Sequence, residues 1–163
     1  MAIKDSHTEQ QIKEAAKRLF FKEGRFKATT QEIADAAGVN RTLVNYYFRS
    51  RDVLFDEVLK DAREAMTNRL KTSVGQEDIP FRVRIESFID VVMEHSLTYP
   101  YMDIYIVSRM NDDFNHESDI IANIKKNEDL KMFLKMIEGE MNKGNIEKME
   151  PVQFLLSLMS LLI

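Results

Sequence analysis

The chain of 163 residues contains no cysteine, which excludes a disulfide-linked scaffold and any metal site built on thiolates. The absence is compatible with a reducing cytosol. The first residues, MAIKDSHTEQQ, lack the apolar core of a signal peptide, so we expect a cytoplasmic protein. Sustained alternation of apolar and polar residues is also missing, while apolar residues recur at helical spacing, and the sequence therefore predicts an all-α fold.

Motifs of enzyme chemistry are missing as well. There is no glycine-rich phosphate loop, no serine nucleophile elbow and no supported pair of carboxylates, so we expect neither catalysis nor a bound cofactor. One polar cluster has spacing that suits metal ligands on one helix face: Asp112, Asp113, His116 and Glu117. A single histidine without a second cluster leaves the coordination shell incomplete. We interpret this segment as a solvated polar turn and expect no metal.

The most informative stretch runs from Thr29 to Arg51 and reads TTQEIADAAGVNRTLVNYYFRSR. Thr29 and Glu32 have capping-box spacing, in which a hydroxyl and a carboxylate cover free N–H groups where a helix begins. Gly38 can adopt the positive φ that ends a helix, and Asn40 is suited to cap the next one. The stretch predicts two short helices joined by a tight turn.

The second of these helices is expected to have two different faces. The side that can be buried carries Leu43, Val44, Tyr47 and Phe48 at helical spacing. The opposite side carries Arg41, Thr42, Asn45, Tyr46 and Arg49. These outward residue types suit a DNA major groove, because arginine forms a bidentate fork with guanine and asparagine pairs with adenine. Similar helix pairs also occur in proteins that never bind DNA, so an interaction module or an enzyme on a helical scaffold stays an alternative.

The residues on both sides extend the pattern. The pattern comprises I-x-x-A-A-x-x-L-F from Ile12 to Phe20, then Gly24, TT-x-EIA-x-x-AGV from Thr29 to Val39, and YYF-x-S-x-x-x-L from Tyr46 to Leu54. It resembles the TetR family of bacterial transcription regulators. Two positions depart from the family pattern. Arg25 stands where an aromatic residue often follows the glycine, and Asn45 stands where the family often has tyrosine, which bears on the operator sequence because Asn45 lies on the reading face.

The resemblance implies a three-helix DNA-binding head at residues 1–50 and a helical body at residues 51–163 that binds an effector and forms a homodimer. Bases would be read by Arg41, Thr42, Asn45 and Tyr46. Phosphates would be held by Thr29, Thr30, Tyr47 and Arg51. Family members commonly continue with one more helix, so we expect the chain to be shortened at its C-terminus.

The charge of the chain is divided unevenly. The net charge is −4 overall, yet residues 1–60 hold 11 Lys and Arg against 9 Asp and Glu. Residues 61–163 hold 12 against 18. The more positive part of the chain is therefore the part that carries the DNA-binding pattern.

The later part of the chain is rich in methionine and tyrosine. Nine of the ten methionines follow residue 60, and three of the five tyrosines lie between Tyr99 and Tyr105. Methionine is flexible and polarizable, so such a body can form an adaptable pocket for a small apolar or aromatic effector. By resemblance, we place this pocket among Phe88, Val92, Met93, Tyr101, Tyr105, Phe133 and Met136. Each of these residues also fits an ordinary core position.

The final segment, PVQFLLSLMSLLI, is apolar on nearly every helical face. Its 13 residues are too few for a membrane span, which needs ~20. In the resembled family a helix in this region packs against its copy in a second subunit. We therefore expect dimerisation through Phe154, Leu155, Leu158, Met159 and Leu162.

Taken together, these features predict a ligand-responsive transcription regulator that binds a pseudo-palindromic DNA operator as a homodimer and is released by a small effector. We expect a repressor. The alternatives are an activator, or a DNA-binding dimer without an effector.

Overall fold

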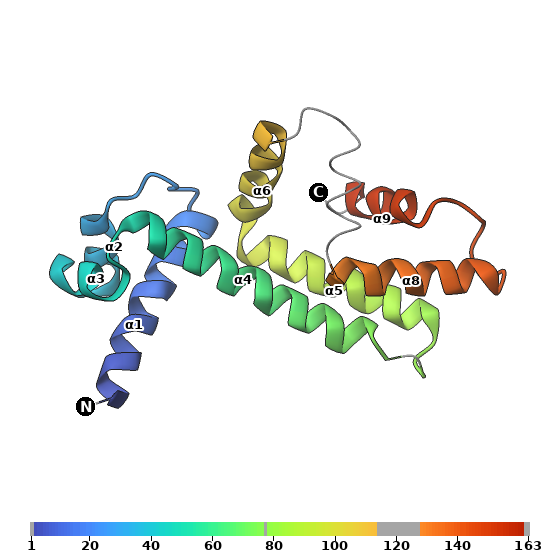
Figure 1. Ribbon diagram of the computed structural model, residues 1–163, viewed down its shortest axis with the longest axis horizontal. Coiled ribbons are helices and arrows are strands. Elements are labelled where there is room, and N and C mark those ends of the chain that lie inside the picture. The colour runs from blue at the N-terminus through green and yellow to red at the C-terminus, as the bar shows by residue number, and fades with distance from the viewer. Residues whose placement is uncertain (1, 77, 114–127, 162–163) are drawn as a thin grey trace. The chain divides into compact units, whose positions relative to one another are not determined.

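The computed structural model describes residues 2–76, 78–113 and 128–161, and every regular element in these ranges is a helix (Figure 1). The all-α prediction is confirmed. The described residues form two compact units, one from Met1–Ala65 with His95–Ile106 and the other from Met66–Glu94 with Val107–Ile163. The functional division predicted at residue 50 stays a prediction. None of the described helices is both long and apolar enough to cross a membrane.

The first unit begins with α1 (Ala2–Lys17), which continues into a π-helical segment, η1 (Arg18–Lys22). The wider π turn is closed by the N–H of Glu23 donating to the carbonyl of Arg18 at 2.9 Å. Three successive apolar side chains, Leu19, Phe20 and Phe21, are all buried there. The helix then ends before Gly24, which has a φ of +70°.

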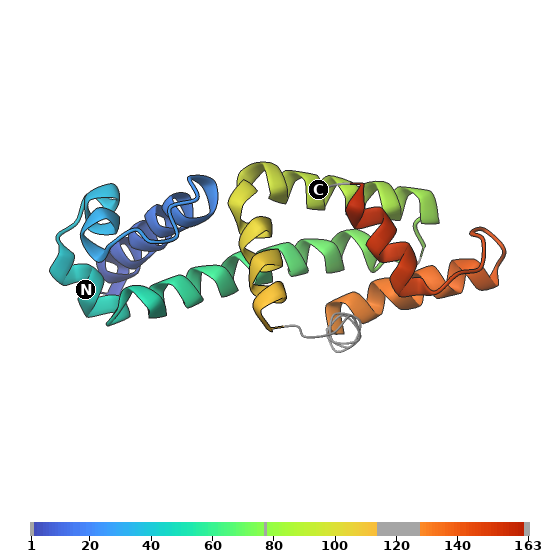
Figure 2. The same cartoon turned by 90° about the horizontal axis from the view of Figure 1, so that it is seen from above.

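Two short helices, α2 (Thr30–Ala37) and α3 (Arg41–Phe48), pack against α1 and against each other (Figures 1 and 2). The first part of α4 (Arg51–Val74) closes the same core. Apolar residues at helical spacing before and after the two short helices are buried in this core, namely Ile12, Ala16, Leu19, Phe20, Leu54, Phe55, Val58 and Ala62.

The first unit also includes the end of α5 (Phe81–Thr98) and the start of α6 (Pro100–Asp113). Met102 is buried in the core of this unit, and the Tyr105 ring lies 5.0 Å from that of Phe55. The ring of Tyr101 lies so close to Gly24 that an added Cβ there would be 2.8 Å from its Cδ1. An aromatic surface of α6 is therefore part of this unit.

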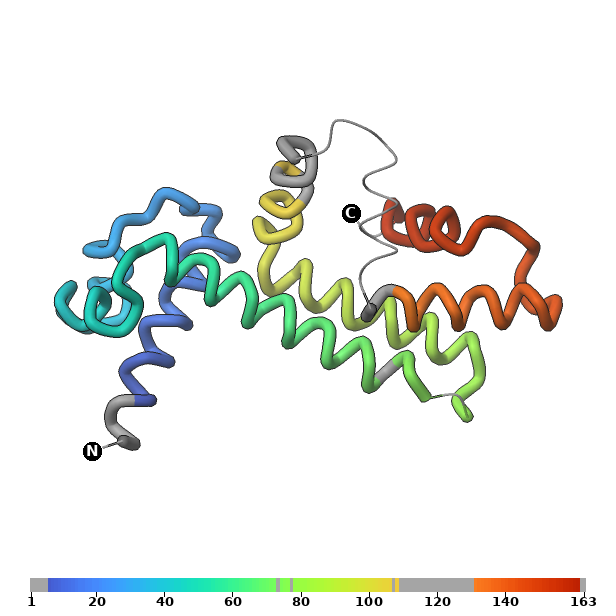
Figure 3. The backbone as a smooth tube through the Cα atoms, viewed as in Figure 1, coloured from blue at the N-terminus to red at the C-terminus, as the bar shows by residue number. Residues whose placement is uncertain are grey.

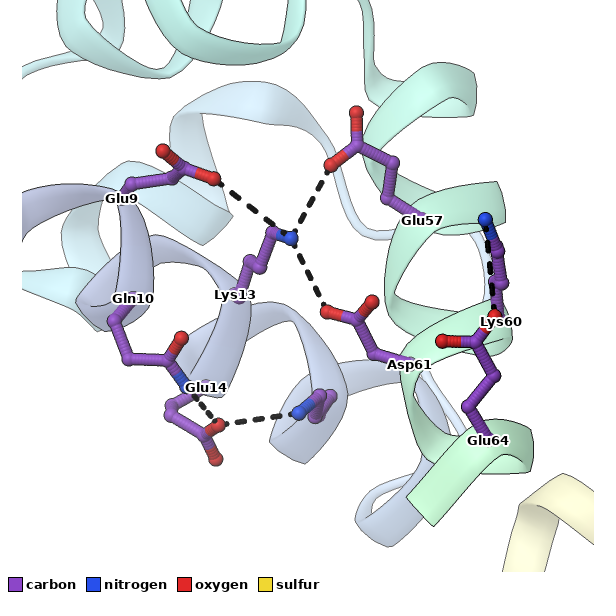
Figure 4. A network of polar contacts seen from close by, with 9 residues as sticks. Glu9, Gln10, Lys13, Glu14, Glu57, Lys60, Asp61 and Glu64 are labelled. Carbon is purple, nitrogen blue, oxygen red and sulfur yellow. Dashed lines mark hydrogen bonds and ion pairs between the residues drawn. The ribbon is translucent and has the colours of Figure 1, made fainter. Parts of the chain in front are cut away.

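A charged network joins α1 to α4 (Figure 4). The Lys13 Nζ lies 3.1 Å from Asp61, 3.3 Å from Glu57 and 3.7 Å from Glu9. Burial is the largest single influence on the pKa of Lys13 and lowers it, but the hydrogen bonds and charges of Asp61 and Glu57 together outweigh burial. The pKa of Lys13 therefore lies above its ordinary value, and the network favours the folded state while Lys13 is charged.

The second unit contains the end of α4, most of α5, α8 (Glu128–Asn142) and α9 (Pro151–Ser160). A short link joins α4 to α5, because α4 ends at Val74 and α5 begins at Phe81. The chain reverses at this link, as Figure 3 shows, and Arg69 on α4 pairs with Glu94 on α5 at 2.6 Å. The core of the unit contains Val74, Phe88, Val92, Phe133, Met136, Ile137, Met141, Val152 and Leu155.

Candidate nucleic-acid interface

The start of α2 carries the predicted capping box. The N–H of Glu32 donates to the Thr29 hydroxyl at 3.3 Å, and the N–H of Thr29 donates to the Glu32 carboxylate at 2.7 Å. The Thr29 backbone N–H is the main reason that the pKa of the Glu32 carboxyl lies below its ordinary value, and the Thr29 hydroxyl and Arg25 act in the same direction. The helix therefore begins at Thr30, as the sequence predicts.

The turn between the two helices also has its predicted form. Gly38 has a φ of +68°, and its N–H donates to the carbonyls of Ala34 and Asp35. The side chain of Asn40 accepts a hydrogen bond from the N–H of Leu43 at 2.9 Å. A left-handed glycine ends the first helix and an asparagine cap begins the second, which fixes the direction in which α3 leaves the turn.

The helix α3 presents a buried side and an exposed side. Val44 and Phe48 are buried, whereas Leu43 and Tyr47 are half-buried. The predicted outward residues are all exposed, namely Arg41, Thr42, Asn45, Tyr46 and Arg49. Tyr46 is 71% exposed, which is unusual for so large a ring and leaves its surface available to a partner. The structure thus brings together the four residues predicted to read bases.

Sequence reasoning missed the tight connection between α3 and α4. Arg49 has a φ of 58° and a ψ of −46°, and the N–H of Ser50 donates to the carbonyl of Phe48 at 2.5 Å. This is a γ-turn with a positive central φ, a strained geometry for a residue with a side chain. A glycine or asparagine would have signalled it, but an arginine does not. The Ser50 hydroxyl then accepts a hydrogen bond from the N–H of Val53 at 3.2 Å and caps α4.

Arg51 has internal partners that the sequence did not indicate. Its Nε donates to the carbonyl of Ala28 at 3.0 Å, one Nη donates to the carbonyl of Phe26, and the other meets Asp52 at 2.5 Å. Its guanidinium also lies 5.5 Å from the centre of the Phe20 ring. Arg51 therefore ties the loop before α2 to the start of α4. A phosphate contact by Arg51 stays a prediction and would have to compete with these bonds.

The seven residues predicted to line an effector pocket are divided between the two units. Phe88, Val92, Phe133 and Met136 belong to the core of the second unit, where the Phe88 and Phe133 rings stack at 4.4 Å. Met93 is exposed. Tyr101 and Tyr105 belong to the first unit. The structure therefore brings together four of the seven in one core, and Met136 among them also lines a cavity.

The residues predicted to form the dimer interface lie mostly against their own chain. Leu155 is buried in the core of the second unit, and Phe154, Leu158 and Met159 are partly buried against it. The exposed apolar residues of this region are Leu156 and Leu161. Leu162 lies outside the described residues, as do His116 and Glu117 of the polar cluster. Among the residues that the structure describes, no group of three or more histidine, aspartate or glutamate side chains is placed so that it could hold a metal ion.

The capped α2, the glycine turn and the exposed polar side of α3 define a helix-turn-helix head. Residues 12–58 match the family model described as bacterial regulatory proteins, tetR family. Two curated relatives come from Pseudomonas putida, the HTH-type transcriptional regulator TtgR and the probable HTH-type transcriptional regulator ArpR. Each is 31% identical to this chain over 72 residues. These matches cover 44% of this chain and 34% of each relative, so they span about a third of the relatives' length.

Two solved structures have a similar fold. The probable transcriptional regulatory protein RHA5900 matches with a TM-score of 0.64 and 17% identity, over 92% of this chain and 80% of its own. A HlyIIR mutant protein matches with a TM-score of 0.60 and 18% identity, over 96% of this chain and 83% of its own. Residues 12–58 therefore carry the sequence pattern of the tetR family of bacterial regulatory proteins, which confirms the resemblance seen in the sequence.

Proposed function

We propose that this chain regulates transcription by binding a pseudo-palindromic DNA operator as a homodimer in the cytoplasm. The observation that carries the proposal is the exposed side of α3, where Arg41, Thr42, Asn45 and Tyr46 are all accessible on a helix that a capped turn holds in place. One α3 from each subunit would enter successive major grooves. The same four residues would contact base edges there.

Phosphate contacts would set the register of each head on the DNA. A helix N-terminus favours anions, and Thr29 and Thr30 lie at the N-terminal end of α2. Tyr47 is half-buried, so its hydroxyl end is suited to reach a phosphate while its ring packs in the head. Contacts of this kind add affinity for every sequence and make binding sensitive to salt.

Regulation would follow from an effector that binds the operator-free form better than the operator-bound form. Such an effector weakens operator binding by the same factor by which the operator weakens effector binding. We propose a small apolar or aromatic effector and a repressor that the effector releases. The support is the methionine-rich second part of the chain and the helix α4, which contributes residues to both units.

A DNA-binding dimer without an effector is the second candidate. The observation that favours it is the stacking of Phe88 on Phe133 within a packed core, because residues that fill a core do not surround a void. A screen of apolar and aromatic compounds against the protein–operator complex separates the two. Release of DNA by a compound supports the first candidate, and stable complexes throughout support the second.

The test of the DNA-binding proposal uses two matched arginine variants. An operator is first selected from a pool of random duplexes, and Arg41→Ala is then compared with Arg63→Ala at fixed salt. Arg63 is exposed on α4, 12 positions beyond its first residue, or roughly 18 Å along the helix. We expect Arg41→Ala to weaken operator binding by ~1–3 kcal/mol while Arg63→Ala has little effect. Failure to select any sequence, or equal losses in the two variants, would overturn the base-reading role.

A further inference from the structure

A polar cavity of about 430 Å³ lies in the second unit. Its lining comes from Gly75 just after α4, from Arg84 near the start of α5, and from α8 with the residue that follows it. Four charged residues line it, Arg84, Lys135, Glu140 and Lys143. Three are cations and one is an anion, so the cavity carries a net positive charge within a chain whose overall charge is −4.

The side chain that sets the character of the cavity is Arg84. It is only 8% exposed, and its Nε donates to the carbonyl of Val74 at 2.9 Å. A guanidinium has five N–H donors, and within the described part of the chain this bond is the one that Arg84 makes. Burying a charged group is costly unless it is paired and hydrogen-bonded. The terminal N–H groups of Arg84 therefore favour an acceptor inside the cavity.

Glu140 does not supply that acceptor, although it is only 5% exposed. One of its oxygens accepts from the Lys143 Nζ and the other from the Asn145 Nδ2, each at 2.7 Å. The hydrogen bond from Lys143 is the largest reason that the pKa of Glu140 lies below its ordinary value, so Glu140 is charged and already paired. Among the described residues, Arg84 and Glu140 form no ion pair within 4.0 Å, although the charge of Arg84 also contributes to the lowered pKa of Glu140. The cavity lining therefore keeps an excess of positive charge from Arg84 and Lys135.

The cavity has room for a small organic molecule. Binding pockets for such ligands commonly measure ~300–1,000 Å³, and about 430 Å³ lies within that range. An added Cβ at Gly139 would meet no atom within 4 Å, which shows open space at that wall. An added Cβ at Gly75 would lie 2.6 Å from the carbonyl oxygen of Lys71, so a side chain is excluded there.

We propose that this cavity binds a small anion bearing a carboxylate or phosphate group, with Arg84 as its bidentate partner. A planar guanidinium fork matches the two oxygens of either group, and such charge-assisted pairs are among the strongest hydrogen bonds in proteins. Lys135 is exposed at the cavity and adds attraction without being part of the core. The site involves the second unit alone and does not depend on the proposed DNA-binding function.

The experiment is calorimetric titration of the whole chain with two probes, inorganic phosphate and succinate. Ionic strength is held constant with sodium chloride, so that general screening does not change during the titration. We expect saturable binding of at least one probe. Binding of phosphate alone or of succinate alone identifies which oxyanion the site prefers, and both results support the proposal.

Two variants on α5 form a matched pair. Arg84→Gln should weaken binding by ~10-fold or more, equivalent to ~1.4 kcal/mol. Arg82→Gln makes the same change on the same helix at a side chain that is 88% exposed and paired with Glu86, and it should leave the affinity unchanged. Arg84→Gln also loses the bond to Val74, so its fold is checked by circular dichroism. Lys135 is exposed, so Lys135→Gln tests the binding of the probe without disturbing the core. It should weaken binding by ~3-fold.

Two results would overturn the proposal. The first is the absence of saturable binding of both probes to the unaltered chain. The second is that Lys135→Gln and a folded Arg84→Gln both bind the probe with the affinity of the unaltered chain. Neither measurement involves DNA, so a negative result here leaves the helix-turn-helix proposal standing, and failure of DNA binding leaves this one standing.

Discussion

Two glycines with nearly the same backbone conformation provide a quantitative test of the packing in the first unit. Gly24 has a φ of +70° and Gly38 a φ of +68°, so alanine meets the same backbone penalty at both positions. Their surroundings differ. An added Cβ at Gly24 would lie 2.8–3.0 Å from three ring atoms of Tyr101, whereas an added Cβ at Gly38 would have no atom within 4 Å.

The expected losses of stability follow from the backbone penalty, which the two positions share, and from the contact with Tyr101, which only Gly24 has. The left-handed conformation costs a residue with a Cβ ~1–2 kcal/mol, which is the whole effect expected for Gly38→Ala. Gly24→Ala adds overpacking against the Tyr101 ring, which typically costs ~1–3 kcal/mol more. The contact includes Tyr101 Cγ, the ring atom nearest the backbone, so a small rotation of the ring does not remove it. Gly24→Ala should therefore be the more destabilising by ~1–3 kcal/mol.

The assay is urea unfolding followed by circular dichroism. The free energies of unfolding can be compared when the variants have the same m value, the slope of free energy against urea concentration. A third variant, Tyr101→Ala, completes a double-mutant cycle with Gly24→Ala. Tyr101 is 42% exposed, so its removal leaves only a modest cavity. In the Tyr101→Ala background, Gly24→Ala should cost no more than Gly38→Ala does. Equal losses for the two single glycine variants, or a Gly24→Ala cost unchanged by Tyr101→Ala, would refute this packing of α6 on the head.

Three further predictions concern single positions. Because Arg49 has a positive φ, Arg49→Gly should be more stable than Arg49→Ala by ~1 kcal/mol in urea unfolding, the reverse of their order within a helix. Lys13→Met leaves three carboxylates without their shared cation and should cost ~1–3 kcal/mol, against ~0.5 kcal/mol or less for Lys60→Met at an exposed pair. In the unaltered chain the Lys13 contribution is complete below its ordinary pKa of 10.5 and is lost as pH rises further, so Lys13→Met should remove part of the alkaline fall in melting temperature. Folding lowers the pKa of Glu140, so its contribution to stability is present above its ordinary pKa of 4.5 and is lost as pH falls. Glu140→Gln should therefore reduce the fall in melting temperature at acid pH. An unchanged fall at acid pH would contradict this role of Glu140.

The features that the sequence predicted well are local ones. The Thr29–Glu32 capping box, the left-handed Gly38 and the Asn40 cap each depend on residues within four positions of one another. Such short-range bonds leave a direct pattern in the sequence. The burial of the apolar stripes was also predictable, because helical spacing states which side chains share a face.

The features that the sequence did not predict depend on distant contacts or on an unusual backbone. Arg49 adopts a positive φ although its residue type is no sign of one. Arg51 bonds to the loop before α2, more than 20 positions earlier in the chain. Tyr101 lies against Gly24, and no periodicity links these positions. Helical spacing also identifies inward-facing residues without showing whether they fill a core or surround a cavity, which is why Arg84 was not recognised.

Sequence-specific DNA binding is the central claim, and a mobility-shift titration tests it most directly. The whole chain is titrated at fixed salt against DNA from around its own gene, with random DNA as competitor, because affinities depend on salt and on nonspecific phosphate contacts. We predict one discrete complex of a protein dimer that resists the competitor. Binding that the random DNA removes in proportion to its amount, or no binding at all, would contradict the claim that the exposed side of α3 reads an operator.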